Sequence, residues 1–293
     1  MSTSTTVQTT GRTVASPPHV SFDSVSKDFR GRSGVPYRAL DSVSFEVPAG
    51  SFTAIVGPSG CGKSTLLRIL AGLDFPTTGQ VQVEGKPVVS LQPDTVGFLF
   101  QQDALLPWKT VADNVALGLK LQGRRAEETR ELVDEWLRKV NLHEFRDRYP
   151  AQLSGGMRKR VAIAQTLATD PPLLLMDEPF TALDVQSRHL MEMDLLELSG
   201  EGERTVVFVT HDLDEAAALA DTVVVLSSGP RSSVKSIVPV EISRPRDLLA
   251  IRSNPRYGAC CRTRYGQAVT PAGRRRPTRR ACRADSHRAR HRD

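Results

Sequence analysis

Residues 51–70 read SFTAIVGPSGCGKSTLLRIL, and this stretch guides the interpretation of the whole chain. Ser51–Val56 is a short β-rich run, a glycine-rich loop follows it, and the residues after the loop are typical of a helix. The loop fits the pattern G-x-x-x-x-G-K-[ST] at the strand-to-helix junction that this pattern requires. Its glycines let backbone N–H groups turn inward, and the helix directs its positive N-terminus to the same place. We therefore predict that the phosphates of a nucleotide bind at Gly57, Pro58, Ser59, Gly60, Cys61, Gly62, Lys63, Ser64 and Thr65.

Two side chains of this loop have specific predicted roles. Lys63 is expected to reach the β- and γ-phosphates of ATP, and the Ser64 hydroxyl is expected to ligate Mg²⁺. Cys61 occupies a variable position of the pattern, and we expect no redox role for its thiol. The loop thus predicts a protein that binds ATP together with Mg²⁺.

A second motif is the apolar run LLLMDEP at residues 173–179, which predicts a strand ending in two acids. Asp177 suits the Mg²⁺ shell, as the acid at the end of such a strand does in other phosphate-loop enzymes. Glu178 stands one residue further on, where it is placed to activate a water for attack on the γ-phosphate. Two neighbouring acids can also simply end a strand, but the phosphate loop upstream favours the catalytic interpretation.

The pattern beyond these motifs predicts an α/β fold with a parallel-strand sheet. Further candidate strands are Thr205–Thr210 and Thr222–Ser227, and helical segments alternate with the strands from His19 to about Val240. The strand signal disappears between Thr110 and Pro150, where residues 125–140 carry one apolar helical face. We therefore expect a helical subdomain inserted into the α/β core.

Charge is distributed unevenly along the 293 residues, whose formal net charge is +6. Residues 261–293 hold 11 Arg and 2 Asp, so the remainder of the chain is mildly acidic. The apolar runs are strand-sized and far shorter than a membrane span, and the N-terminal residues lack the apolar segment of a secretory signal. Only Cys61 lies in the body of the chain, which gives no disulfide framework and indicates a reducing compartment. We expect a cytosolic protein with no nucleic-acid partner.

A third motif, Leu153-Ser154-Gly155-Gly156-Met157, lies between the phosphate loop and the acidic strand. Two glycines after a serine at a helix start offer exposed N–H groups and a hydroxyl to an anion. With the three motifs in this order, residues 19–246 resemble the nucleotide-binding subunit of ATP-binding cassette (ABC) transporters. The resemblance implies a P-loop NTPase core with an N-terminal antiparallel β region and an inserted helical subdomain.

The resemblance also implies roles for residues outside the phosphate loop. Two copies would form a head-to-tail dimer, in which Ser154, Gly155 and Gly156 contact the γ-phosphate bound by the other copy. The family usually has Gln where this chain has Met157, a position that we expect to contribute packing. The remaining implied residues are Gln101 of the Q-loop (with Gln102 as the alternative register) as a catalytic and Mg²⁺-sensing residue, Asp184 of the D-loop, the catalytic switch histidine His211, and Phe29 (with Tyr37 nearby) as the aromatic that stacks on adenine.

The implied domain organisation has three parts. Residues 1–17 are expected to be disordered, 18–246 to form the ATP-binding domain, and 247–293 to be an extension that is basic and disordered after about residue 258. The helical subdomain is expected at about residues 102–156.

Three functions are open to such a chain: an importer subunit, a nucleic-acid-associated ABC ATPase, and a non-catalytic interaction module. Lys63 and Ser154 lie too close in sequence for the long coiled coil of chromosome-maintenance ABC proteins, and the intact catalytic residues disfavour an inactive module. The run FQQDALLPW at residues 100–108 resembles the nitrate/sulfonate/taurine import subfamily. We therefore expect an ATPase that works as a homodimer with membrane permease subunits and, indirectly, an extracytoplasmic solute-binding protein. Its expected location is the cytoplasmic face of the membrane.

Overall fold

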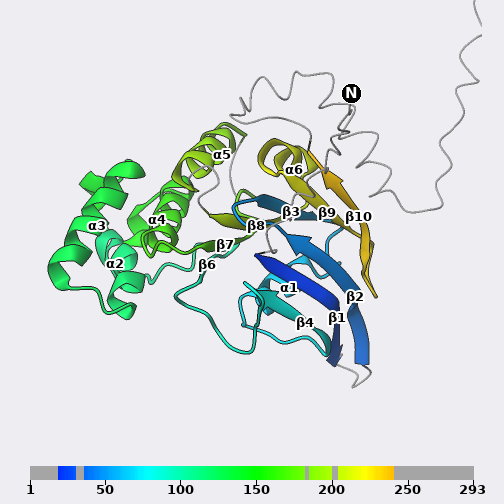
Figure 1. Ribbon diagram of the computed structural model, residues 1–293. Helices are drawn as coiled ribbons and strands as arrows, with labels where there is room; N and C mark the ends of the chain where they lie inside the picture. Colours follow the sequence, from blue (N-terminus) through cyan, green and yellow to red (C-terminus); the bar gives the residue numbers. More distant parts are fainter. Residues whose placement is uncertain (1–18, 31–35, 182–184, 200–203, 241–293) are drawn as a thin grey trace, which may run out of the picture.

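A mainly parallel sheet of six strands forms the centre of the computed structural model, which describes residues 19–30, 36–181, 185–199 and 204–240 (Figure 1). The strand order is β10-β9-β3-β8-β7-β6, and only β10 runs antiparallel to its neighbour. The bounds are β3 (Phe52–Val56), β6 (Val96–Leu99), β7 (Leu173–Asp177), β8 (Thr205–Thr210), β9 (Thr222–Leu226) and β10 (Val234–Pro239). The predicted α/β fold is confirmed. Because β3, β8 and β7 are parallel neighbours, their carboxyl ends lie at the same edge of the sheet.

A second, antiparallel sheet has the order β2-β1-β4-β5. Its strands are β1 (Val20–Arg30), β2 (Pro36–Val47), β4 (Thr78–Val83) and β5 (Lys86–Pro87). Helix α1 (Lys63–Leu70) packs between the two sheets, where Leu66, Leu67 and Leu70 are fully buried. This packing fixes the start of α1, and with it the phosphate loop, against the end of β3.

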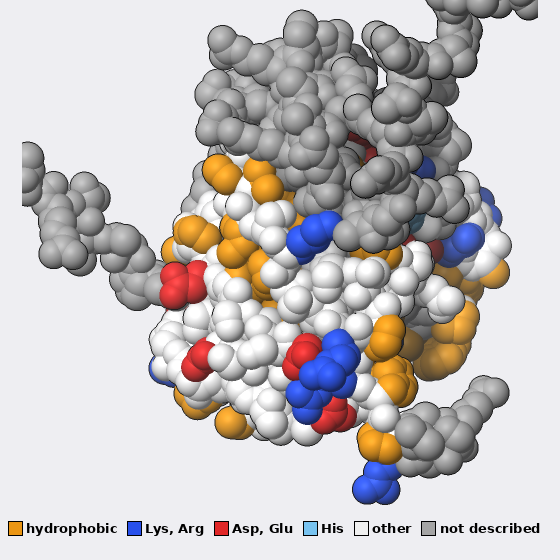
Figure 2. Space-filling model, turned by 90° about the vertical axis from the view of Figure 1, so that its right-hand side faces the viewer, with side chains coloured by type: hydrophobic (Ala, Val, Ile, Leu, Met, Phe, Trp, Pro, Cys, Tyr) orange, Lys and Arg blue, Asp and Glu red, His pale blue; other side chains and the backbone are white. Residues whose placement is uncertain are grey.

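Ion pairs connect this second sheet to the turn before β10. Arg38 donates to Asp28 at 2.8 Å and to Asp41 at 3.1 Å, and Arg231 donates to Asp41 at 3.1 Å. Figure 2 views the molecule from the right-hand side of Figure 1, and on the visible described surface basic side chains lie beside acidic ones. The pairs therefore tie β1 and β2 to the edge of the central sheet.

The helical part lies at one end of the central sheet, beyond β6 (Figure 1). It contains α2 (Val111–Leu121), α3 (Ala126–Lys139), the short 3-10 helices η1 (His143–Phe145) and η2 (Pro150–Gln152), and α4 (Gly155–Leu167). Val133, Trp136 and Leu137 of α3 are buried, as its apolar face predicts. The inserted helical subdomain is thus confirmed.

Two more helices complete the described fold: α5 (Val185–Ser199), which follows β7, and α6 (Leu213–Leu219), which follows β8. Helix α6 packs on β3 and β8, and α5 contacts α4. Among the described residues, no helix combines the length and apolar character needed to cross a bilayer. The predicted disordered N-terminus at residues 1–17 and the predicted extension at 247–293 lie outside the described residues.

Candidate active site

The phosphate loop leaves β3 and ends where α1 begins, at Lys63. The Lys63 side chain is buried, and its Nζ donates to the carbonyl oxygens of Gly57 at 2.9 Å and Pro58 at 3.2 Å. An ammonium group has three donors, so one remains for a ligand. Gly62, at φ +94°, precedes the helix, and no side chain caps the first turn. The N–H groups of that turn are therefore free to meet an anion, as the motif predicts.

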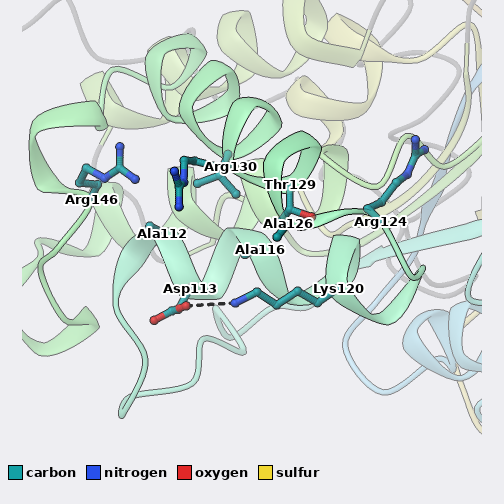
Figure 3. A pocket seen from close by; sticks show the side chains of 10 residues that line it. Ala112, Asp113, Ala116, Lys120, Arg124, Ala126, Thr129, Arg130 and Arg146 are labelled. Atoms are coloured by element: carbon teal, nitrogen blue, oxygen red, sulfur yellow. Dashed lines mark hydrogen bonds and ion pairs between the residues drawn. The ribbon is translucent and has the colours of Figure 1, made fainter.

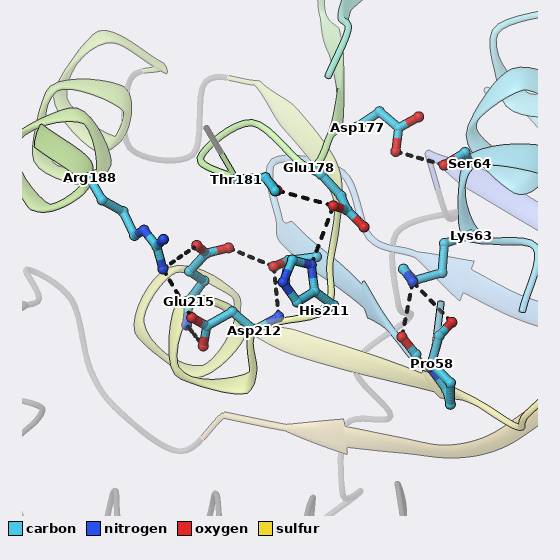
Figure 4. A network of polar contacts seen from close by, with 12 residues as sticks. Pro58, Lys63, Ser64, Asp177, Glu178, Thr181, Arg188, His211, Asp212 and Glu215 are labelled. Atoms are coloured by element: carbon cyan, nitrogen blue, oxygen red, sulfur yellow. Dashed lines mark hydrogen bonds and ion pairs between the residues drawn. The ribbon is translucent and has the colours of Figure 1, made fainter. Parts of the chain in front are cut away.

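A pair of oxygen groups joins the phosphate loop to β7. The Ser64 hydroxyl donates to Oδ1 of Asp177 at 2.8 Å (Figure 4). Burial raises the pKa of Asp177, the Ser64 hydrogen bond opposes this, and neighbouring Glu178 adds to it. A cation would relieve this unfavourable burial of negative charge. Because Mg²⁺ prefers hydroxyl and carboxylate oxygens and takes few protein ligands beside phosphates, Ser64 and Asp177 fit that ion.

Glu178 and His211 come together across the ends of β7 and β8 (Figure 4). Nδ1 of His211 lies 3.3 Å from Oε2 of Glu178, and the Thr181 hydroxyl donates to the same oxygen at 3.0 Å. Glu178 adopts φ +46°, and its N–H donates to the Val209 carbonyl at 3.0 Å, which holds the turn after β7 against β8. Two of the three predicted catalytic side chains are thus positioned by adjacent parallel strands.

Gln101 lies on the exposed loop after β6. Its backbone carbonyl accepts from Lys159 Nζ at 3.4 Å, and the Phe100 carbonyl accepts from the same nitrogen at 3.0 Å. Within the described part of the chain, no hydrogen bond joins the Gln101 side chain to Ser64 or Asp177. The structure therefore does not bring Gln101 into the pair predicted to hold Mg²⁺, and its role there stays a prediction.

The Leu153–Met157 motif forms the start of α4. Ser154 is the N-cap residue, and its Oγ accepts from the Met157 N–H at 3.3 Å. Ser154 and Gly155 are exposed, and no atom lies within 4 Å of a Cβ built on Gly156. This geometry leaves the helix start open to a group from outside the chain, and the contact with a second copy stays a prediction.

Phe29 and Tyr37 occupy paired positions on β1 and β2, and their rings stack at 5.8 Å between centroids. Phe29 is half-buried, whereas Tyr37 is 51% exposed. Both aromatic side chains therefore remain candidates for contact with adenine. The predicted D-loop residue Asp184 lies outside the described residues.

Two buried charged residues next to these groups, Lys159 on α4 and Glu215 on α6, belong to none of the sequence motifs. Lys159 shares a helical face with the buried residues Ala162 and Ile163, and Glu215 shares one with Ala218 and Leu219. A single charge within an apolar helical face was the available signal, because such a charge must find a partner inside the fold.

A pocket of about 450 Å³ lies between α2 and α3, away from the predicted site residues (Figure 3). Basic side chains line it, and several are paired with acids: Lys120 with Asp113 at 3.3 Å and Arg146 with Asp134 at 2.6 Å. None of the residues predicted to bind nucleotide lines this pocket.

Comparison with known proteins shows the family. Residues 40–181 match the ABC transporter family. The chain is 49% identical over 219 residues to an uncharacterized ABC transporter ATP-binding protein, MJ0412, of Methanocaldococcus jannaschii, covering 75% of this chain and 81% of that one. It is 42% identical over 238 residues to the nitrate import ATP-binding protein NrtD of Synechococcus elongatus, covering 80% and 86%. A solved dimeric structure of the ATP-binding cassette MJ0796, in a post-hydrolysis state bound to ADP and Pi, matches with a TM-score of 0.68 and 35% identity, covering 76% of this chain and all of that one. The chain therefore belongs to the family of ABC transporter ATP-binding proteins, and it is an ATPase.

Proposed function

We propose that this chain is the ATP-hydrolysing subunit of an importer whose membrane channel is a separate polypeptide. The observation that carries the proposal is the meeting of the Glu178 carboxylate and the His211 imidazole at the ends of β7 and β8. Strand β8 lies between β7 and β3, so this pair sits at the same sheet edge as the phosphate loop. A base and a phosphate-binding loop at the same edge of the central sheet are suited to the attack of water on a γ-phosphate.

In this proposal each side chain has a separate task. The loop amides and the free donor of Lys63 bind the β- and γ-phosphates. Ser64 and Asp177 hold Mg²⁺, which supplies charge neutralisation on the phosphates when bound. Glu178 accepts the proton of the attacking water at its carboxylate, and His211 bonds the γ-phosphate. Thr181 and His211 both contact Oε2 of Glu178, which restricts the direction of the carboxylate.

Hydrolysis in this scheme needs two copies of the chain. Ser154, Gly155 and Gly156 at the exposed start of α4 would contact the γ-phosphate held by the other copy. The dimeric solved structure of a related cassette supports this arrangement. Because the γ-phosphate bridges two chains and ADP lacks it, ATP binding favours the closed dimer and product release reopens it. Closure would drive the permease to its outward-facing state.

The permease is proposed to dock beside the loop after Gln101. Large apolar side chains are exposed there: Phe100 at 42%, Trp108 at 69% and Leu121 at 82%. A groove of about 240 Å³ between β6, α2 and α4 lies in the same region, with Phe100 and Leu121 among its lining residues. Such a surface suits an apolar partner segment. Docking there would place the chain at the cytoplasmic face of a membrane.

The proposed solute is a small anion of the nitrate, aliphatic sulfonate or taurine kind. The similarity to NrtD supports nitrate among these. We further propose that residues 18–246 form the ATP-binding domain, with residues 102–156 as its helical part. The solute itself would be selected by the permease and the external binding protein.

The test is reconstitution of the full chain in proteoliposomes with the permease and binding protein encoded beside its gene. ATP-driven uptake and ATPase stimulation are measured with nitrate, taurine and an alkanesulfonate. Trp108→Ala should reduce the permease-stimulated ATPase rate while leaving the Kd for ATP unchanged. Ile237→Ala is the matched control, since Ile237 is exposed on β10 at the opposite end of the sheet. Absence of uptake of all three solutes would refute the proposed solute class, and equal effects of the two variants would refute the docking surface.

A further inference from the structure

Glu215 is a buried carboxylate with no assigned role in the proposed hydrolysis of ATP. It lies on α6, four residues after His211, and only 4% of it is exposed. Its Oε2 accepts from the Thr210 hydroxyl at 2.6 Å, and its Oε1 lies 3.5 Å from Nη1 of Arg188 (Figure 4). A carboxylate in such surroundings is costly unless its partners are held in place, so these contacts constrain both neighbours.

The contacts of Glu215 continue to both residues that flank His211. The Thr210 hydroxyl, which donates to Glu215, accepts from the Asp212 N–H at 3.0 Å. The Asp212 carboxylate accepts from Arg188 at 3.3 Å and from the Asp214 N–H at 2.8 Å. These four residues (Thr210, Asp212, Glu215 and Arg188) are called the Glu215 cluster below. The residues directly before and after His211 therefore both belong to this cluster.

The Glu215 cluster also includes a residue of α5, the helix that follows β7 in sequence. Arg188 lies on α5, which follows in sequence the turn where Thr181 donates to Glu178. The cluster thus connects α5 to the segment that carries His211. Nδ1 of His211 lies 3.3 Å from Oε2 of Glu178. The distance between imidazole and carboxylate depends on how these two segments are held relative to each other.

The geometry points to Glu215 as a positioning residue for ATP hydrolysis: its carboxylate, held between Thr210 and Arg188, fixes the segment that carries His211 against Glu178. This inference rests on the roles proposed for Glu178 and His211. Glu215 acts through other side chains, because its described contacts run to Thr210 and Arg188 and not to the phosphate loop.

Burial and the neighbouring acids make the ionised form of Glu215 unfavourable. Burial raises the pKa of Glu215 to about 7, and the acids Asp212 and Glu192 act in the same direction. The Thr210 hydrogen bond and the Arg188 charge oppose this rise. Removing either partner therefore leaves a carboxylate that the fold tolerates poorly.

The experiment compares steady-state ATPase kinetics of the full chain with those of four variants. Glu215→Ala and Thr210→Val each remove one side of the central hydrogen bond, and Thr210→Val does so with little change of shape. Both should lower kcat by about 10- to 100-fold, the cost of a small misplacement of catalytic groups, while the KM for ATP stays within about twofold. Glu215→Gln should recover part of kcat, because its amide oxygen still accepts from Thr210. Asp134→Ala is the control, since it breaks a carboxylate–arginine pair in the helical part and should leave kcat unchanged.

A second readout reports on His211 itself. In protein with ¹³C-labelled histidine, the His211 ring resonance should shift in Glu215→Ala and Thr210→Val but not in Asp134→Ala. Wild-type kcat in folded Thr210→Val, or an unmoved His211 resonance, would overturn the inference. His211→Ala and Glu178→Gln are measured in parallel. If those two variants hydrolyse ATP normally, the proposed catalytic roles fail; if they are inactive while Thr210→Val is normal, only the inference about Glu215 fails.

Discussion

Replacing Glu215 by Gln should change how the stability of the protein depends on pH. In the folded protein the pKa of Glu215 is raised from its ordinary value of 4.5 to about 7. The native state therefore binds more protons than the unfolded chain between these two values, and stability from this group is lost as pH rises through them. From pH 5.5 to pH 8.5 the loss amounts to about 2 kcal/mol in the free energy of unfolding.

The amide of the Glu215→Gln variant does not titrate, so the variant should not suffer this loss. The free energy of unfolding of Glu215→Gln relative to wild type should rise by about 2 kcal/mol between pH 5.5 and pH 8.5. Urea unfolding of the nucleotide-free chain at both pH values, followed by the fluorescence of Trp108 and Trp136, measures this difference. Glu135→Gln serves as the control, because Glu135 is an exposed residue paired with Lys139. A difference that is the same at both pH values would refute the burial argument for Glu215.

Two further changes test the phosphate loop and the link between α4 and the loop after β6. Gly62→Ala should destabilise the protein by about 1–3 kcal/mol and weaken ATP binding, because Gly62 has φ +94° and a Cβ there would lie 2.6 Å from Leu40. Thermal unfolding measures the loss of stability, and nucleotide titration measures the loss of affinity. Unchanged values would contradict the assigned loop geometry. Lys159→Met removes a buried cation from the carbonyls of Phe100 and Gln101 and should lower the free energy of unfolding by about 1–3 kcal/mol. Lys159→Arg should retain part of this stability. Equal stability of the Lys159→Met variant and wild type in urea unfolding would show that these hydrogen bonds contribute nothing.

The sequence predicted strands β3, β7, β8 and β9 of the central sheet, because their signals are local, but it missed β6 and β10. Apolar runs at residues 173–177 and 205–210 lie in strands with those bounds, and the glycine-rich loop lies between strand and helix. The antiparallel sheet followed only from the family resemblance. Strands β1 and β2 carry register shifts, and Ser24 and Ser42 take φ +51°, so the simple alternation of buried and exposed side chains is interrupted.

Site residues that belong to a sequence motif could be predicted. Contacts between residues on different strands could not, because they depend on how the strands pair. Ser64 and Asp177 were predicted to share a cation, and they meet at 2.8 Å. The contact between Glu178 and His211 depends on parallel pairing of β7 and β8, which no local pattern specifies. Glu215 escaped notice because an acid in the first turn of an alanine-rich helix gives no sign of which strand it faces.

The proposed mechanism depends on Glu178 as the base that activates water. Glu178→Gln keeps the size and hydrogen-bonding capacity of the side chain but is too weak a base to accept the proton. The direct measurement is its single-turnover rate of ATP hydrolysis, together with size-exclusion chromatography in ATP and in ADP. We expect a rate lower by about 10²–10⁴-fold and a dimer that accumulates with ATP, is absent with ADP, and is lost when Lys63→Ala is added. Hydrolysis by Glu178→Gln at the wild-type rate would show that Glu178 is not the base.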